Sequence, residues 1–175
     1  MCRKARFNFR AKVTDDVDKD GWYKGGISIL SNTTYCFEFE EDYERAAQRG
    51  KDPRRHYIFF EKMTDLGLGL PKRHYRVPVR TETLCMCTEY VKDNKYVYEG
   101  DIIKEEFGSI GLIKFGKYSN VNDSPKTEHY GFYIEWKDGE LLRKDIGYWM
   151  NLDTTKVIGN IIDNPELLAR RVGDD

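Results

Sequence analysis

The pattern in this sequence that comes closest to a catalytic one is a carboxylate and a lysine two residues apart. Glu135 and Lys137 stand in "YIEWK", and Asp123 precedes them. In metal-dependent nucleases, two such carboxylates hold a divalent cation and the lysine helps to orient the attacking water. Side chains at i and i+2 of a strand point to one face, so Glu135 and Lys137 can act together. The same pair also suits the solvated face of a hairpin, and so short a pattern often arises by chance.

A second pair of acids, Glu99 and Asp101, flanks Gly100 in "YEGDII". Two carboxylates at this spacing can share a divalent cation. The alternative is a turn in which Gly100 takes a backbone conformation closed to other residues, while Asp101 accepts hydrogen bonds from neighbouring backbone N–H groups. We favour the turn, because two isoleucines follow at once and lead into a core strand.

The cysteines, glycines and histidines give no sign of a metal or cofactor site. Cys85 and Cys87 match none of the strong zinc spacings, and we expect them to be buried thiols. Gly108 and Gly111 lead into a strand-like segment, whereas a phosphate-binding loop leads into a helix. Each of the three histidines precedes a tyrosine in strand-like sequence, where surface positions are commoner than catalytic ones. We therefore expect no cofactor, no metal and no catalytic residue.

A basic and aromatic run, "PKRHYRVPVR", carries the clearest sign of a binding function. Cations bind phosphates and aromatic rings stack on bases, so a run of both without an acid suits nucleic acid. The alternative is a sheet edge that charge protects from aggregation. The candidate nucleic-acid-binding residues are Lys72, Arg73, His74, Tyr75, Arg76 and Arg80, and "RRHYIFF" can extend the patch with Arg54, Arg55 and Tyr57.

The composition favours a β-rich fold and excludes several functions. The chain has 175 residues, of which 39% are apolar, 14% aromatic and 34% charged, and its net charge is −1. So many aromatic residues favour strands, and the near-neutral charge argues against a chain that is strongly basic as a whole. The sequence shows no secretory signal and no apolar run long enough to span a bilayer, so we expect a cytoplasmic protein without membrane contact.

Alternating apolar residues predict strands along most of the chain. Residues 4–13 are predicted to form a strand with one solvent-exposed face, which includes Lys12. Gly25–Gly26 are predicted to form a bulge or bend in the next strand. Pro78 places its own strand at a sheet edge or leaves it unpaired. Residues 129–146 read as a hairpin that turns at Asp138–Gly139. Further strands are expected at 34–40, 52–63, 83–90, 111–118 and 154–163.

Two helices and one internal division complete the expected architecture. An internal helix is predicted at 40–50, and a short C-terminal helix at 164–172 with Asn164 as N-cap and Pro165 in its first turn. In the second half, short strands recur between glycine turns, which suggests a small barrel. We therefore expect a mainly β fold (β-rich α+β), with an N-terminal β-rich subdomain at 1–85 and a C-terminal small β-barrel at 86–175, packed as one compact unit.

Three motifs along the chain resemble those of the YopX family of bacteriophage and prophage proteins. They are "RFNFRAK" (residues 6–12), "YEGDII" (98–103) and "VIGNIIDNPELL" (157–168), although Lys12 stands where the family usually has an aromatic residue. The resemblance implies an SH3-like character for the C-terminal barrel and an origin in a phage or prophage, in a bacterial cytoplasm. It implies no activity. The structural motif residues are Tyr98, Glu99, Gly100, Asp101, Gly159, Asn160, Asn164 and Pro165.

The leading hypothesis for function is a non-catalytic binding module of the YopX type. Its partner is expected to be nucleic acid or a phage or host protein, and a homo-oligomer is a further option, because exposed strand edges and tyrosines suit self-association. No small-molecule substrate is indicated. The alternative is a metal-dependent nuclease or phosphoesterase that uses Asp123, Glu135 and Lys137.

Overall fold

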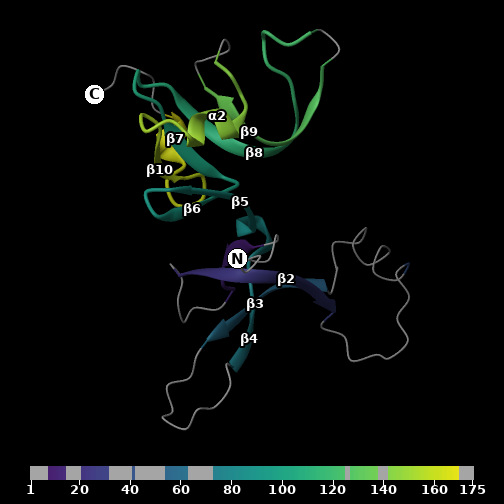
Figure 1. Ribbon diagram of the computed structural model, residues 1–175. Coiled ribbons are helices and arrows are strands. Elements are labelled where there is room, and N and C mark those ends of the chain that lie inside the picture. Colours follow the sequence, from purple (N-terminus) through teal and green to yellow (C-terminus); the bar gives the residue numbers. More distant parts are fainter. Residues whose placement is uncertain are drawn as a thin grey trace, which may run out of the picture. The chain divides into compact units, whose positions relative to one another are not determined.

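The computed structural model describes residues 8–14, 21–31, 41, 54–62, 73–124, 127–137 and 142–169. The described residues are mainly β with few helices, which confirms the predicted fold class (Figure 1). The chain divides into two compact units, Met1–Leu84 and Cys85–Asp175. Within its described part, the chain has no helix long and apolar enough to cross a membrane. The assignment of 1–85 and 86–175 as subdomains of one compact body stays a prediction.

The N-terminal unit contains an antiparallel sheet of four strands in the order β4-β3-β2-β1. Strand β4 lies at the edge, as the proline near its end predicted, since proline cannot donate to a further ladder. The predicted strand at 34–40 lies outside the described residues, and of the predicted internal helix only Glu41, which is helical, is described. The strands are β1 (Phe9–Lys12), β2 (Trp22–Ser31), β3 (Arg54–Lys62) and β4 (Arg73–Pro78).

Two adjacent glycines mark the point where β2 changes its pairing partner. Residues 22–25 pair with β1 and residues 26–31 pair with β3, and neither ladder contains a register shift. A Cβ atom on Gly25 would lie 1.8 Å from the carbonyl oxygen of Phe59, whereas one on Gly26 would meet nothing within 4 Å. Gly25 is therefore required by a close approach of two backbones rather than by a bulge.

The ends of β1 and β4, the first and last strands of this unit, meet at one point. Val13, just after β1, forms a bridge with Val79, just after β4, and the backbone N–H of Arg80 donates to the carbonyl of Lys12 at 2.8 Å. The sheet is thereby curled around a small core in which Ala11 and Ile58 are fully buried. One bridge is not a ladder, so the described strands of this unit form a curled sheet rather than a closed barrel.

The C-terminal unit combines a hairpin, β5–β6, with an antiparallel four-stranded sheet in the order β10-β7-β8-β9. Asp93 and Asn94, which connect β5 to β6, both have positive φ, as a two-residue hairpin turn requires. No ladder among the described residues closes these strands into a barrel. The strands are β5 (Cys85–Lys92), β6 (Lys95–Tyr98), β7 (Asp101–Lys104), β8 (Ile110–Tyr118), β9 (His129–Trp136) and β10 (Lys156–Asn160).

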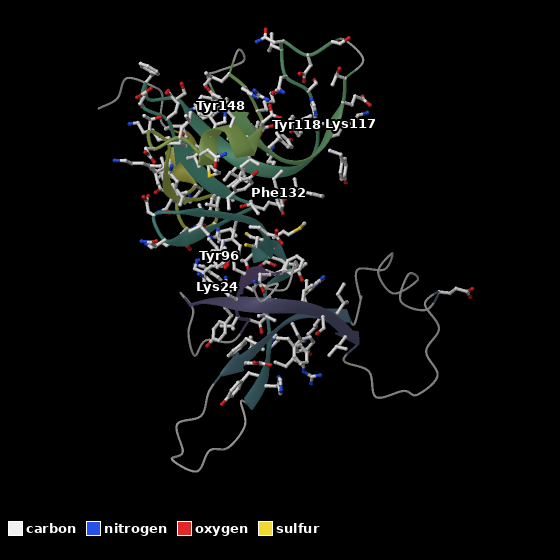
Figure 2. All side chains as sticks on the ribbon, in the orientation of Figure 1. Lys24, Tyr96, Lys117, Tyr118, Phe132 and Tyr148 are labelled. Carbon is white, nitrogen blue, oxygen red and sulfur yellow. The ribbon has the colours of Figure 1, made fainter. Side chains whose placement is uncertain are left out.

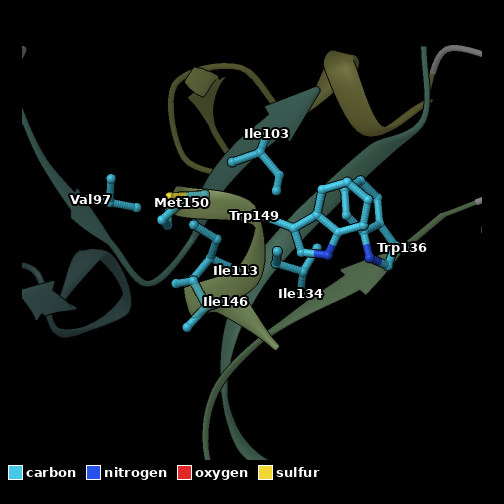
Figure 3. Packing of buried hydrophobic residues seen from close by; sticks show 8 residues of the cluster. All are labelled: Val97, Ile103, Ile113, Ile134, Trp136, Ile146, Trp149 and Met150. Carbon is cyan, nitrogen blue, oxygen red and sulfur yellow. The ribbon is translucent and has the colours of Figure 1, made fainter. Parts of the chain in front are cut away.

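Both faces of the four-stranded sheet are packed. Helix α3 (Glu166–Ala169) covers one face with two leucines that contact Ile102, Ile110 and Leu112. The other face packs against helix α2 (Ile146–Met150) and β6 (Figure 3). The cluster on that face consists of Val97, Ile103, Ile113, Ile134, Trp136, Ile146, Trp149 and Met150.

Two tryptophans in this cluster share one hydrogen-bond acceptor. The indole rings of Trp136 and Trp149 meet edge to face at 4.8 Å, and both Nε1–H groups donate to the carbonyl of Arg143, at 2.9 and 2.6 Å. A buried indole N–H without a partner would be costly. The Arg143 carbonyl therefore ties the segment before α2 to the core of the sheet.

Of the hairpin predicted at 129–146, the first arm is confirmed, the turn at Asp138–Gly139 lies outside the described residues, and the described part of the second arm, 142–145, is not a strand. Strand β9 pairs with β8, and the return segment adds only a bridge between Tyr133 and Asp145 and a bond from the backbone N–H of Ile134 to the carbonyl of Lys144. The chain then enters α2, a helix that the alternating sequence pattern did not predict. The three buried residues of α2, Ile146, Trp149 and Met150, recur at helical spacing and pack on the sheet. This packing stabilises a helix, although the preceding residues alternate as in a strand.

The two glycines of β2 give a direct test of the close approach. We expect Gly25→Ala to lower the free energy of unfolding by at least about 2 kcal/mol, because the backbone of β2 or β3 must move. Gly26→Ala is the matched control and should change it by less than about 1 kcal/mol. Urea unfolding followed by circular dichroism measures both, and equal effects of the two substitutions would contradict the strand pairing described above.

Candidate functional site

The curled N-terminal sheet has an inner face and an outer face with different chemistry. On β3, Ile58 and Phe60 point into the core, so Tyr57 and Phe59 point to the opposite side. The registers with β1, β2 and β4 place the neighbours of Tyr57 and Phe59 on the same side. We call this side the outer face. Its charged and aromatic residues are Arg10, Lys12, Trp22, Lys24, Arg55, Tyr57, Phe59, Glu61, His74 and Arg76.

The outer face is strongly basic, although the whole chain is close to neutral. Among the described residues it carries five lysines and arginines and a single acid, Glu61, which lies 3.8 Å from Nδ1 of His74. Lys24, Arg55 and Arg76 are exposed, and Figure 2 shows Lys24 on the N-terminal unit. A local excess of positive charge attracts polyanions even where the net charge of the chain is small.

Aromatic rings lie among these cations. The guanidinium of Arg10 lies 4.6 Å from the centre of the Trp22 ring, and that of Arg76 lies 5.0 Å from the centre of the Tyr57 ring. Phe59, in contrast, is 43% exposed. Cation–π contacts hold the long side chains over the rings and so fix where their charge is presented.

The burial of Lys12 corrects the prediction that this face of the first strand is exposed to solvent. Lys12 is only 9% exposed, and its ammonium lies 5.5 Å from the centre of the Trp22 ring. The aliphatic stem of a lysine can be buried while its charge finds an aromatic partner. Both Ala11 and Lys12 are therefore buried, although they point to opposite faces of β1.

The predicted basic run does not form one surface. His74 and Arg76 lie on the outer face, but Tyr75 points to the inner face and stacks on Phe60 at 5.4 Å. Arg80 follows the strand and is half-buried. Lys72 lies outside the described residues, as does the side chain of Arg73.

The outer face is instead assembled from several strands. Arg55 and Tyr57, which the sequence offered as an extension of the run, lie on it, and β1 and β2 add Lys24 and two further cations. Alternation within "RRHYIFF" separates Tyr57 and Phe59 from the apolar Ile58. This alternation is the sequence signal that predicts which β3 residues lie on the outer face. The residues of β1 and β2 could be assigned to the outer face only from the pairing of the strands.

A second polar cluster lies at the end of the β8–β9 hairpin. The hydroxyl of Tyr118 donates to Asp145 at 2.9 Å, and Nδ2 of Asn120 and Nε of Arg143 donate to the same carboxylate at 2.9 and 2.6 Å. Burial raises the pKa of Tyr118 to about 12, and the hydrogen bond to Asp145 adds to the effect. Burial alone would raise the pKa of Asp145, but the three donated hydrogen bonds hold it below its usual value. The carboxylate is fully satisfied and serves to anchor the loop.

A pair of glycines makes room for aromatic stacking beside this cluster. Gly116 and Gly131 face each other across β8 and β9, so no side chain separates Tyr118 from Tyr133. The two tyrosine rings stack at 5.2 Å, and the ring of His129 lies on the other side of Tyr118 at 5.1 Å. Gly116 has φ +152°, which L-residues with side chains rarely adopt. The stack stiffens the hairpin where it leaves the sheet.

The three residues of the nuclease hypothesis are not brought together. Asp123 lies 3.0 Å from Nε2 of His129 at the start of β9, and the backbone N–H of Asn120 together with that ring lowers the pKa of Asp123. Glu135 lies near the end of β9, about 20 Å of extended strand away, and pairs with Lys114. In the described parts of the chain, no group of three or more His, Cys, Asp or Glu residues could hold a metal ion. The geometry gives no support to a two-carboxylate metal site.

The two sequence motifs around "YEGD" and "GNIIDNPE" lie side by side. Asp101 is buried and accepts a hydrogen bond from the backbone N–H of Tyr98 at 2.8 Å, and Gly100 has φ +80°. The predicted turn is thereby confirmed. The carbonyl of Gly100 accepts from the backbone N–H of Ile161 at 2.8 Å, and Asn160 is the register partner of Asp101. Both motifs thus hold β10 against β7.

The last motif also builds the turn before α3. The side-chain oxygen of Asn160 accepts from the backbone N–H groups of Ile162 and Asp163. Oδ1 of Asn164 accepts from the backbone N–H of Asn160 at 3.4 Å and would lie 2.6 Å from a Cβ on Gly159. The side chain of Asn164 therefore turns back to β10, where the sequence predicted an N-cap. The short C-terminal helix itself is confirmed and begins after Pro165.

Fold and surfaces together define a mainly β protein of two small units, in which the most distinctive motifs serve architecture and the most distinctive surface is basic and aromatic. A model of the YopX protein family matches residues 21–169. The chain belongs to this family, as the resemblance of its motifs indicated. A search of curated proteins finds no match to the chain.

The raised pKa of Tyr118 predicts a loss of stability at alkaline pH. Because the folded state favours the protonated phenol, this contribution is fully present below about pH 10 and is lost as the pH rises through about 12. We expect the free energy of unfolding to fall more steeply over this range in the wild type than in Tyr118→Phe, as measured by urea unfolding. Tyr130→Phe removes an exposed hydroxyl from the same hairpin and should follow the wild type. Identical pH profiles for Tyr118→Phe and the wild type would contradict this role.

Proposed function

We propose that the protein is a non-catalytic nucleic-acid-binding module and that the outer face of the N-terminal sheet is its binding surface. The observation that carries the proposal is the gathering of five cations and three aromatic rings on one face, with a single acid among the described residues. Lysine and arginine contribute to phosphate binding by releasing counterions, and aromatic side chains stack on bases.

The arrangement suits a polyanion better than a protein partner or a second copy of the chain. The cores of protein interfaces are depleted in charged residues, lysine included. Of the two exposed arginines, Arg76 is the register partner of the exposed Phe59, and Arg55 lies on the same face of β3 beyond Tyr57. A charged surface that merely protects a sheet edge needs no aromatic residues, and the cations here extend from edge strand β4 across to β1.

The C-terminal unit is proposed as the scaffold of the module, with a partly open, SH3-like barrel. In support, the backbone N–H of Glu99 donates to the carbonyl of Met86, and that of Gly100 to the carbonyl of Ile113. These bonds connect the β5–β6 hairpin to the four-stranded sheet. Family membership fits an origin in a phage or prophage and a place of action in the bacterial cytoplasm, which we also propose.

Binding of fluorescein-labelled DNA and RNA oligonucleotides, followed by anisotropy over a salt series, tests the proposal. We expect affinity to fall steeply with salt. Arg55→Gln and Lys24→Gln should each weaken binding several-fold, and each should reduce the slope of log Kobs against log salt by about 1. Lys95→Gln removes an exposed cation from β6 in the other unit and is the charge-matched control.

Three results would overturn the proposal. They are a flat salt response, equal effects of all three substitutions, and self-association of the chain through the outer face without any binding of nucleic acid. The last result would assign the outer face to a homo-oligomer instead. Cleavage of the oligonucleotides in Mg²⁺ that is lost in Glu135→Ala would revive the nuclease hypothesis.

A further inference from the structure

We propose that the outer face binds single strands in preference to duplexes, with neighbouring bases stacked on the ring of Phe59 and on the guanidinium of Arg76. This inference rests on the proposed function and names its substrate class. Two observations support it: the spacing of Tyr57 and Phe59 along β3, and the position of the Arg76 guanidinium over the Tyr57 ring.

The spacing of the two rings on β3 fits an extended strand of nucleic acid. Tyr57 and Phe59 are two residues apart on one face, which corresponds to about 6.6 Å along a strand. In a duplex, successive nucleotides of one strand advance by only about 3.4 Å. Bases placed on both positions must therefore be unstacked from each other, and a single strand can extend in this way whereas a duplex cannot.

The two stacking positions differ in chemistry. Phe59 is 43% exposed and offers an apolar ring. The Tyr57 position is covered by Arg76, whose guanidinium lies 5.0 Å from the ring centre. A guanidinium plane that rests on a ring can stack on a base with its other side and can also pair with a phosphate. Arg76 is the register partner of Phe59, so both positions belong to one continuous surface.

The outer-face residues of β3 form a row whose two ends differ in charge. Along β3 the outer face reads Arg55, Tyr57, Phe59 and Glu61, so a cation precedes the stacking positions and an acid follows them. The acid repels phosphate, and its partner His74 lies 3.8 Å away. The row therefore accommodates about two stacked bases, with the backbone of the single strand approaching from the Arg55 side and ending before Glu61.

The test compares oligothymidylates of increasing length with a hairpin duplex of equal charge at one fixed salt concentration. We expect the single strands to bind on the order of tenfold more tightly than the duplex. Phe59→Ala should weaken single-strand binding on the order of tenfold, because a stacking platform is lost. Ile29→Ala removes an exposed apolar side chain from the opposite face of the same sheet and is the control for folding and for affinity.

A lysine substitution separates the guanidinium plane from its charge. Arg76→Lys keeps the charge and loses the plane, so it should weaken single-strand binding several-fold while the salt slope stays unchanged. Arg55→Lys is the matched control and should bind as the wild type does. Glu61→Gln should bind more tightly than the wild type, because it removes the repelling acid.

The outcomes distinguish this inference from the proposed function. Duplex binding as tight as single-strand binding, or equal effects of Arg76→Lys and Arg55→Lys, would overturn the single-strand inference and leave nucleic-acid binding in place. Absence of salt-dependent binding to every oligonucleotide would overturn both. Circular dichroism and thermal unfolding of each variant exclude misfolding as the cause of a lost affinity.

Discussion

The two-residue period of β3 is the constraint on which the N-terminal unit depends. Ile58 and Phe60 must reach the core, so every second residue between and beside them is forced outward. A slip of the register by one residue would bury Arg55 and expose Ile58, so the register is strongly specified. The close approach at Gly25 fixes the same register from β2. A basic and aromatic outer face therefore follows from how the sheet packs.

The C-terminal unit depends on a different kind of contact, in which short motifs hold distant segments together. The turn at Gly100 bonds to Ile161, and the carbonyl of Arg143 accepts both core indoles. These bonds satisfy buried polar groups and fix the ends of strands. Two of the three motifs that mark the family, "YEGDII" and "VIGNIIDNPELL", lie in this unit and indicate architecture rather than chemistry. The third motif, "RFNFRAK", lies in the other unit and contributes Arg10 and Lys12 to the basic face.

Strands with clear alternation were predictable from the sequence, because the signal is local. The hairpin turn at Asp93–Asn94 and the turn at Gly100 were predictable for the same reason, since both require positive φ. The helix α2 was missed because five residues carry little helical pattern until they pack on the sheet. Burial of Lys12 and the inward turn of Tyr75 depend on partners in other strands. The outer face combines four strands, so a linear run of basic residues could identify only part of it.

An NMR titration of the ¹⁵N-labelled chain with a short oligothymidylate tests the central claim most directly. Amide signals at Lys24, Tyr57, Phe59 and Arg76 are predicted to shift together and to saturate at one ratio. Signals of the β8–β9 hairpin, including Tyr118, are predicted to stay in place. Shifts confined to the C-terminal unit, or shifts at the inner-face residues without any on the outer face, would contradict the account.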